Sequence, residues 1–152
     1  MKTILTYGTF DLLHVGHLNM LERLKSMGDK LIVGVSTDEF NQQKGKQSIF
    51  SFDERARIIN ALSCVDEVIP EKNWQQKPED IHKYNVDIFG IGDDWQGKFD
   101  SLNEFCEVHY LSRTKDISST SLKQALSNID KEFIRQIKDN LDHMFTIVKA
   151  ME

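Results

Sequence analysis

Two histidines flank a glycine in the segment YGTFDLLHVGHLNML, which covers residues 7–21. His14 and His17 stand three residues apart, so both rings lie on one face if this part of the chain is helical. At the first turn of a helix, free backbone N–H groups and the helix dipole favour phosphate, and two imidazoles there can donate further hydrogen bonds to it. Gly16 removes a side chain where a ligand must come close. The spacing therefore predicts a phosphate-binding site.

The elements that must position these histidines alternate along the chain. Apolar and β-branched runs predict strands, and helical periodicity with capping signals predicts the helices between them. The predicted strands cover 2–7, 31–36, 65–69, 86–91 and 108–111, and the predicted helices cover about 13–27, 51–63, 78–84 and 118–126. Alternating strands and helices imply an α/β protein with a doubly wound parallel sheet. Ligands of such sheets bind beyond the carboxyl ends of the strands, where residues 8–11 leave the first strand.

The chain beyond this pattern is predicted to be a helical extension. Apolar residues recur at helical spacing around a polar face after about residue 130, and they include Phe133, Ile137, Leu141 and Val148. Such a stripe covers apolar surface, either in the same chain or in a partner. We therefore divide the chain into a domain of residues 1–129 and a C-terminal helical extension of residues 130–152.

Composition excludes several functional classes. A formal charge of −5 over 152 residues argues against a general nucleic-acid binder, because nonspecific affinity for nucleic acids comes mostly from phosphate neutralisation. No apolar run approaches the roughly 20 residues that a membrane span needs, and the N-terminus lacks the pattern of a secretory signal. Cys64 and Cys106 have no metal-ligand spacing and read as reduced thiols. We expect a soluble cytoplasmic protein that neither enters membranes nor coats nucleic acid.

Several motifs resemble those of a known enzyme superfamily. GTFDLLHVGH resembles the HxGH motif of the nucleotidyltransferases, and RTKDISST at 113–120 resembles their second element, usually close to RTxGIST. Three longer stretches are similar to bacterial glycerol-3-phosphate cytidylyltransferases: STDEFN at 36–41, VDEVIPEKNW at 65–74 and GDDWQGKFD at 92–100. The resemblance covers about residues 1–125 and implies a Rossmann-like nucleotidyltransferase fold.

The resemblance also implies a reaction. It implies transfer of CMP from CTP to glycerol 3-phosphate, which gives CDP-glycerol and pyrophosphate and feeds synthesis of a teichoic acid or similar cell-surface polymer. It further implies Mg²⁺ as cofactor and a homodimer. The catalytic residues that it implies are His14, His17, Lys44 and Arg113.

The remaining site residues follow from the resemblance together with their places after predicted strands. The nucleotide-binding residues are expected to be Thr9, Phe10, His14, His17, Lys46, Gly92, Asp94, Trp95, Arg113, Thr114, Ile117, Ser118 and Ser119. The acceptor-binding residues are expected to be Asp11, Asp38, Lys44 and Arg55, and Asp11 is also the expected Mg²⁺ ligand. Arg55 stands in the first turn of a predicted helix, where a cation opposes the helix dipole, and this cost favours a ligand-facing role.

Simpler interpretations stay open for some of these residues. Asp11 and Asp38 could cap helices, Trp95 could pack into the core, and residues 44–46 could be an ordinary solvated loop. Asp116 replaces the glycine usual in RTxGIST, and Ser63 stands where the cytidylyltransferases commonly carry an arginine. Two alternatives therefore remain: a nucleotidyltransferase with another phosphorylated acceptor, and a nucleotide-binding module that has lost turnover.

Overall fold

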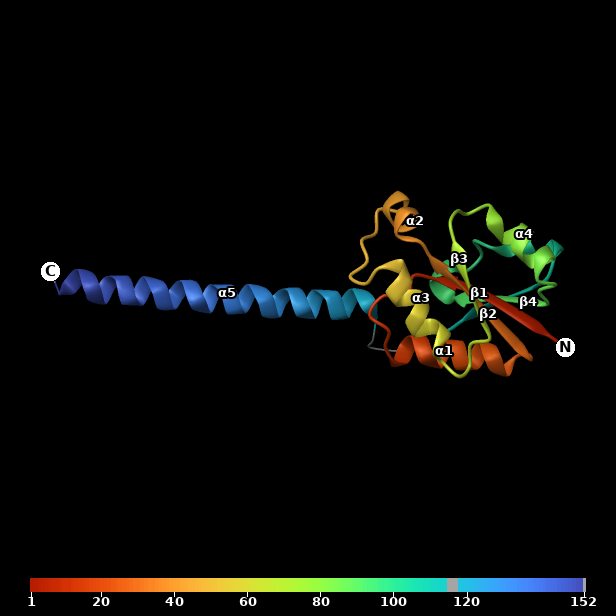
Figure 1. Ribbon diagram of the computed structural model, residues 1–152, viewed down its shortest axis with the longest axis horizontal. Helices are drawn as coiled ribbons and strands as arrows, with labels where there is room; N and C mark the ends of the chain where they lie inside the picture. Colours follow the sequence, from red (N-terminus) through yellow and green to blue (C-terminus); the bar gives the residue numbers. More distant parts are fainter. Residues whose placement is uncertain (115–117, 152) are drawn as a thin grey trace. The chain divides into compact units, whose positions relative to one another are not determined.

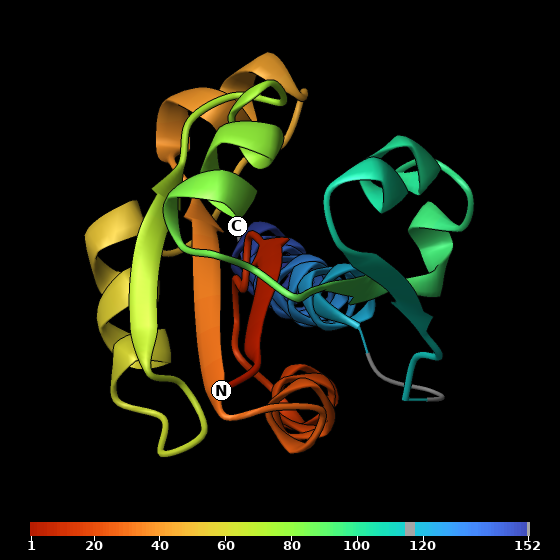
Figure 2. The same ribbon diagram turned by 90° about the vertical axis from the view of Figure 1, so that its right-hand side faces the viewer.

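The computed structural model describes residues 1–114 and 118–151, which form two compact units that divide between residues 117 and 118. The first unit contains a five-stranded parallel sheet in the order β3-β2-β1-β4-β5, which Figure 2 shows from left to right. The strands are β1 (Thr3–Gly8), β2 (Lys30–Ser36), β3 (Glu67–Glu71), β4 (Ile88–Gly92) and β5 (Glu107–Leu111). The predicted α/β class with a doubly wound parallel sheet is confirmed.

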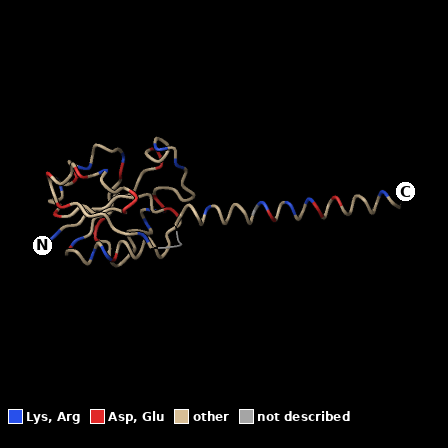
Figure 3. The backbone as a smooth tube through the Cα atoms, turned by 180° about the vertical axis from the view of Figure 1, so that it is seen from behind, with Lys and Arg blue, Asp and Glu red and all other residues tan. Residues whose placement is uncertain are grey.

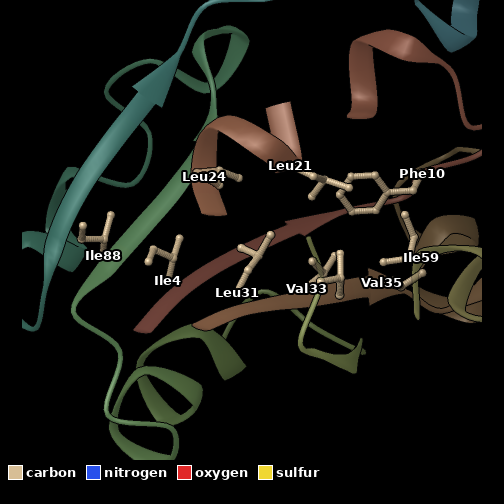
Figure 4. Packing of buried hydrophobic residues seen from close by; sticks show 10 residues of the cluster. Ile4, Phe10, Leu21, Leu24, Leu31, Val33, Val35, Ile59 and Ile88 are labelled. Carbon is tan, nitrogen blue, oxygen red and sulfur yellow. The ribbon is translucent and has the colours of Figure 1, made fainter. Parts of the chain in front are cut away.

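Helices cover both faces of the sheet (Figure 1). The helical elements of the first unit are α1 (Val15–Ser26), α2 (Asp38–Gln43), α3 (Phe52–Asn60), α4 (Gln76–Lys83), η1 (Asp93–Trp95) and η2 (Asp100–Glu104). Because side chains alternate along a strand, Ile4 joins the core beneath α1 and α3, whereas Leu5 joins the core beneath α4 and η2. Figure 4 shows Leu21 and Leu24 of α1 and Ile59 of α3 packed on the first of these faces.

The strand order places the site. Successive connections run outward from β1 to β3 in one direction, and from β4 to β5 in the other, so the order reverses between β1 and β4. A ligand crevice forms at such a reversal, beyond the carboxyl ends of the strands. The loop after β1 and the start of α1, which hold both histidines, lie at this edge.

Strand β3 differs from its prediction by about two residues. Pro70 was expected to end the strand but lies within it, paired with Val35 of β2. A proline lacks an N–H and disrupts a central strand, yet β3 lies at the edge of the sheet and needs partners on one side only. The shift carries Glu71, rather than Ile69, to the carboxyl end of the strand.

Helix α2 was not predicted, although its signal was present. The Thr37 hydroxyl accepts a hydrogen bond from the Phe40 amide, and Asp38 and Glu39 occupy the first turn, where carboxylates complement the dipole. Lys44 ends this helix instead of lying within a long loop.

The second unit is a single helix, α5 (Ser119–Ala150), of 32 residues. Ser118 caps it by accepting a hydrogen bond from the Ser121 amide over 3.0 Å. The expected boundary between residues 129 and 130 falls inside this helix, because helical sequence continues across it without a glycine or proline. Within the described ranges, no helix is both long and apolar enough to cross a bilayer.

Candidate active site

The two histidines close the N-terminus of α1 by capping each other's backbone. His14 is the N-cap residue, and its Nδ1 accepts a hydrogen bond from the Gly16 amide over 3.0 Å. His17 reaches back, and its Nδ1 accepts from the His14 amide over 3.2 Å. This is the reciprocal arrangement of a capping box, with imidazoles in place of the usual hydroxyl and carboxyl side chains. The sequence pattern therefore has a structural cause as well as a chemical one.

Capping fixes the tautomer of both rings. A neutral imidazole that accepts at Nδ1 carries its hydrogen on Nε2, so each histidine presents an Nε2–H donor. The two rings stack with centroids 3.9 Å apart, so the two donors belong to adjacent rings. The Nε2 of His14 is buried and has no hydrogen-bond partner within the described part of the chain. A buried polar atom without a partner calls for one, and an anionic ligand oxygen would supply it.

Burial keeps the two rings neutral. It lowers the pKa of His17 to about 4, with the neighbouring His14 adding to the effect, and it also lowers the pKa of His14. Neutral donors can bind an anion without leaving a buried positive charge behind when the ligand departs. The pair therefore suits repeated binding and release of phosphate.

The loop between β1 and α1 is strained. Phe10 and Leu12 adopt positive φ angles of 54° and 50°, which is uncommon for residues other than glycine. The Phe10 ring is buried and packs edge-on against His17 with centroids 5.6 Å apart. A side chain at Gly8 would meet that ring, since a Cβ there would lie 2.7 Å from Phe10 Cε2. The strain and the close packing hold the backbone against the histidines.

Asp11 fastens this loop to the segment before α3. Its side chain is buried, and its two carboxylate oxygens accept from the Ile49 and Phe50 amides over 2.7 and 3.0 Å. The carboxylate lies near enough to His17 to influence its pKa. Asp11 therefore has a clear structural task beside the histidines, which the sequence did not reveal.

Arg55 was expected to face the acceptor, but the structure buries its side chain. It is 1% exposed, and its guanidinium donates to the Phe50 carbonyl, the Thr9 carbonyl and Asp38 Oδ1 over 3.0, 2.8 and 2.8 Å. All three of its donor nitrogens are thus used inside the protein. The cation is placed against the helix dipole because these acceptors surround it, and not because it faces a ligand.

In the ion pair between Arg55 and Asp38, only Asp38 stays accessible to solvent. Its Oδ2 accepts from the Phe52 amide over 3.0 Å, and its side chain is 46% exposed although Arg55 is fully covered. The Phe52 amide and Arg55 together lower the pKa of the carboxyl group. Arg55 and Asp38 therefore connect the loop after β1 with α2 and the start of α3.

A second group of charges lies at the carboxyl ends of β2 and β3. Glu71 accepts from the Ser36 hydroxyl over 2.5 Å and from the Lys77 ammonium over 2.9 Å, and all three residues are buried. Lys44 donates to the same Ser36 hydroxyl over 3.2 Å, and its Nζ lies 4.0 Å from Glu71. Burial lowers the pKa of Lys44 to about 8, against the opposing attraction of Glu71. Lys46, in contrast, is exposed.

Three members of this group of charges were not predicted from the sequence: Ser36, Glu71 and Lys77. The signal was a charged or polar residue directly after a buried strand, and the misplaced end of the third strand concealed it for Glu71. Lys77 has no such signal. It comes from the first turn of α4, and only the packing of that helix brings its ammonium to Glu71.

Aromatic side chains line the same edge of the sheet. Lys77 Nζ lies 4.6 Å from the centroid of Tyr7 and 4.9 Å from that of Trp74, and Lys44 Nζ lies 4.3 Å from that of Phe40. Trp95 packs against Trp74 with centroids 5.6 Å apart and also joins the core beneath α4. Cations above aromatic faces are stabilised without a carboxylate. The arrangement keeps two positive charges close to Glu71, on side chains that are only 12% and 3% exposed.

The remaining predicted nucleotide-binding residues fall into three groups. Gly92 ends β4, and the exposed Asp94 after it lies 3.4 Å from Arg113, which follows β5. Thr114 accepts from the Asn19 side chain of α1 over 3.2 Å, so this loop lies against the histidine helix. Ser118 and Ser119 begin the second unit. Ile117 and Asp116 lie outside the described residues.

Fold and geometry together define a class. Two imidazole donors lie at a helix N-terminus, at the point where the strand order of a doubly wound sheet reverses. Such a site suits phosphate binding, and the fold is that of an α/β protein of the nucleotidyltransferase type.

Comparison with known proteins narrows the class to a family. Residues 5–125 match the model of the cytidylyltransferase-like family. The chain is 57% identical to the glycerol-3-phosphate cytidylyltransferase of Bacillus spizizenii over 129 residues, 85% of this chain and 100% of that protein. It is 52% identical to the Staphylococcus aureus protein of the same name, over 86% of this chain and 98% of that one. The chain belongs to the cytidylyltransferase-like family, in the group of the glycerol-3-phosphate cytidylyltransferases.

A solved structure shows the same fold at greater distance. The lipopolysaccharide core biosynthesis protein of Thermoplasma volcanium superposes with a TM-score of 0.64 at 27% identity, covering 76% of this chain and 99% of its own. The α/β architecture of the first unit is therefore shared well beyond the near relatives.

The histidine geometry predicts a specific NMR signature. We expect both rings to carry their hydrogen on Nε2, and His17 to stay neutral until the pH falls to about 4. Above pH 6.5, the ordinary pKa, the ring is neutral in both folded and unfolded chains; below it the unfolded chain takes up the proton first. The stability held by a neutral His17 is therefore lost as the pH falls through 6.5 toward 4. Long-range ¹H–¹⁵N spectra across this range report both properties, with exposed His109 as internal control. A His17 ring protonated at pH 6 would contradict the assignment.

The burial of Glu71 and the surface position of Glu67 predict that removing these two carboxylates lowers the unfolding free energy by very different amounts. Glu71→Ala leaves the Lys77 ammonium, 3% exposed, without its carboxylate, and we expect a loss of about 3–5 kcal/mol in unfolding free energy. Glu67→Ala is the matched control, because Glu67 pairs with Lys30 at the surface over 3.0 Å, where such pairs contribute about 0–1 kcal/mol. Urea unfolding of both variants measures the difference. Equal losses would show that Lys77 does not depend on Glu71.

Proposed function

We propose that this protein transfers CMP from CTP to glycerol 3-phosphate and releases pyrophosphate and CDP-glycerol. The observation that carries the reaction type is the pair of neutral Nε2–H donors at the start of α1. The nucleotide and the acceptor are supported by the name of the relatives that match over their whole length. The alternative is the same type of reaction with another phosphorylated acceptor. Pyrophosphate release with different acceptors distinguishes the two.

The proposed chemistry needs no general base. A phosphate monoester has a second pKa near 6, so the acceptor is already a nucleophilic dianion at neutral pH. One of its oxygens forms a bond to the α-phosphorus of CTP, the bond from that phosphorus to the bridging oxygen breaks, and pyrophosphate leaves with the electron pair. The obstacle is the crowding of negative charge, so positioning and electrostatic stabilisation must supply the catalysis.

The nucleotide residues take their proposed roles from this requirement. His14 and His17 donate to the α-phosphate and to the bridging oxygen, while the amides of Thr9 and Phe10 extend the same cradle. Lys46 and Arg113 bring positive charge, and the resemblance also assigns Thr114, Ile117, Ser118 and Ser119 to the outer phosphates. Gly92, Asp94 and Trp95 border the cytidine.

The acceptor residues divide into contacts and supports. Asp38 is exposed enough to accept from a hydroxyl of glycerol, and Lys44 binds the phosphate of the acceptor. Arg55 and Asp11 are buried, and in this proposal they hold the loops that carry Thr9, Phe10 and Asp38 rather than contact the acceptor.

Mg²⁺ is proposed to arrive with the triphosphate. No group of three or more metal-ligating side chains occurs among the residues that the structure describes, so the phosphates must provide most ligands. Mg²⁺ is commonly held in this way, by one or two carboxylates plus substrate phosphates. Asp11 is the carboxylate beside His17, and its two oxygens accept from the Ile49 and Phe50 amides. The ion would neutralise charge on the outer phosphates.

The wider setting is part of the same proposal. A homodimer and a supply of CDP-glycerol to a teichoic acid or similar cell-surface polymer are supported by the resemblance. A cytoplasmic location follows from the substrates, because multiply charged phosphate esters do not pass through a bilayer unaided.

The first test is pyrophosphate release with each of the four nucleoside triphosphates and Mg²⁺. We expect release only when CTP and glycerol 3-phosphate are both present, and its loss when the metal is chelated. Ethanolamine phosphate, a heptose phosphate and another alditol phosphate serve as competing acceptors. Preference for one of these would change the acceptor while keeping the reaction. CTP binding without release for any acceptor would indicate a silent nucleotide-binding module.

Removing one histidine donor should slow the reaction strongly. We expect His17→Ala to lower kcat on the order of a hundredfold, which is typical for loss of one preorganised donor. His109→Ala is the control, because that ring is exposed and pairs with Glu107. Steady-state kinetics with CTP and glycerol 3-phosphate measure both variants. Near-normal turnover in His17→Ala would refute the proposed role.

The pKa of Lys44, about 8, predicts a pH dependence of acceptor binding. The ammonium is charged below this pH and loses its proton above it, whereas the acceptor stays a dianion throughout. We therefore expect the KM for glycerol 3-phosphate to rise from pH 7.5 to 9. Lys44→Arg keeps its charge over the range and should flatten this rise. A KM that rises equally in both proteins would exclude Lys44 as the titrating group.

A further inference from the structure

The C-terminal helix presents an apolar face that the family does not need. The family model ends at residue 125, and the Bacillus spizizenii relative is matched over its entire length by 85% of this chain. Most of α5 therefore lies beyond what the nucleotidyltransferase fold requires. Large apolar side chains are nevertheless dense in this part of the helix, and they are exposed there.

Most of the exposed apolar residues of this helix form one stripe with a regular repeat. The spacing between successive apolar residues alternates between three and four. The residues are Ile134, Ile137, Leu141, Met144, Val148 and Met151. We call these six the seam residues. Spacings of three and four repeated in this way are the heptad pattern by which helices pair with one another. Leu126, Phe133 and Phe145 flank the seam on the same face of the helix.

The stripe is large enough for a specific interface. The nine side chains are between 45% and 81% exposed. Fully burying a side chain of this kind removes roughly 60–120 Å² of apolar surface, so the stripe could bury roughly 500 Å² per copy and about 1,000 Å² in a pair. A specific interface needs about that much.

The first unit does not offer a matching surface. Its large exposed apolar residues, among those described, are Met1, Val15, Ile49, Ile58, Trp74 and Phe105, and these are scattered over six different segments. Scattered apolar residues are normal on a protein surface, whereas a continuous stripe indicates an interaction site. Among the residues that the structure describes, the stripe therefore has no matching apolar surface elsewhere in the same chain.

Charge along the helix favours a second copy over a lipid surface. Residues 126–152 carry four basic and five acidic side chains, a net formal charge of −1, and Figure 3 shows both signs interspersed along α5. Helices that lie on anionic membranes carry mainly lysine and arginine on their polar face. Mixed charge with near-zero net value permits two identical helices to approach without repulsion.

We propose that α5 pairs through its apolar stripe with α5 of a second copy of this chain, as a two-helix coiled coil. The pairing is independent of the proposed reaction, and of any dimer that the first unit forms. From the sequence, the stripe could cover apolar surface either in the same chain or in a partner. The proposed pairing selects a partner, namely a second copy of the chain.

Disulfide cross-linking of the full chain tests this pairing directly. In a background with Cys64→Ser and Cys106→Ser, Leu141→Cys places a thiol near the middle of the stripe. There it faces its counterpart in a parallel pair and lies within about one helical turn of it in an antiparallel pair. Thr146→Cys is the matched control, since residue 146 lies on the polar side of the same helix. Diamide oxidation at micromolar protein should link Leu141→Cys chains into covalent dimers, with at least a tenfold lower yield for Thr146→Cys. Failure at residue 141, or equal yields at both positions, would overturn the proposal.

A second variant separates helix pairing from accidental proximity. Adding Val148→Lys to the Leu141→Cys chain introduces a charge into the seam, and we expect the cross-linking yield to fall at least tenfold. Adding Thr146→Lys, with the same charge on the polar face, should leave the yield within twofold. Equal effects of the two lysines would contradict a paired seam. So would binding of the Leu141→Cys chain to anionic phospholipid vesicles, if that binding abolishes its cross-link.

Discussion

The N-terminus of a helix cannot leave its first N–H groups without partners, and this requirement organises the whole site. In α1 two of these partners are the Nδ1 atoms of His14 and His17. The Nδ1 of each ring accepts a hydrogen bond from a backbone amide. The opposite nitrogen, Nε2, therefore carries the hydrogen and is left as a donor. In the proposed reaction, the same two side chains would therefore meet both the structural need for a cap and the chemical need for phosphate donors.

The charges around the histidines serve mainly to hold backbone segments in place. Arg55 joins the loop after β1 to the segment before α3 and to Asp38, and Asp11 joins the same segments through two amides. These residues are charged, yet they are buried among fixed acceptors and donors. A catalytic geometry that depends on neutral hydrogen-bond donors tolerates little movement, and such internal ionic contacts restrict the loops at a site that must also admit ligands.

Lys44 and Lys77 show how a site can concentrate positive charge without losing stability. Glu71 contacts both of them, and aromatic rings lie close to both ammonium groups. One carboxylate for two lysines leaves a net positive charge at the carboxyl end of the sheet, where an anionic acceptor would complete the balance. The pKa of Lys44 falls to about 8 because burial outweighs its attraction to Glu71.

The sequence by itself determined the parallel sheet, the helix after β1, the histidine pair and the family, because strand and helix periodicity, capping signals and short motifs are local properties. It could not determine that Arg55 is buried, that Glu71 ends β3 or that Lys77 reaches it, since these depend on which segments meet after folding. The edge position of β3 allowed Pro70 inside a strand, and only the strand order decides which strand is at the edge. A charge has the same local pattern whether it binds a ligand or holds a loop, and its neighbours in space, far apart in sequence, decide between the two.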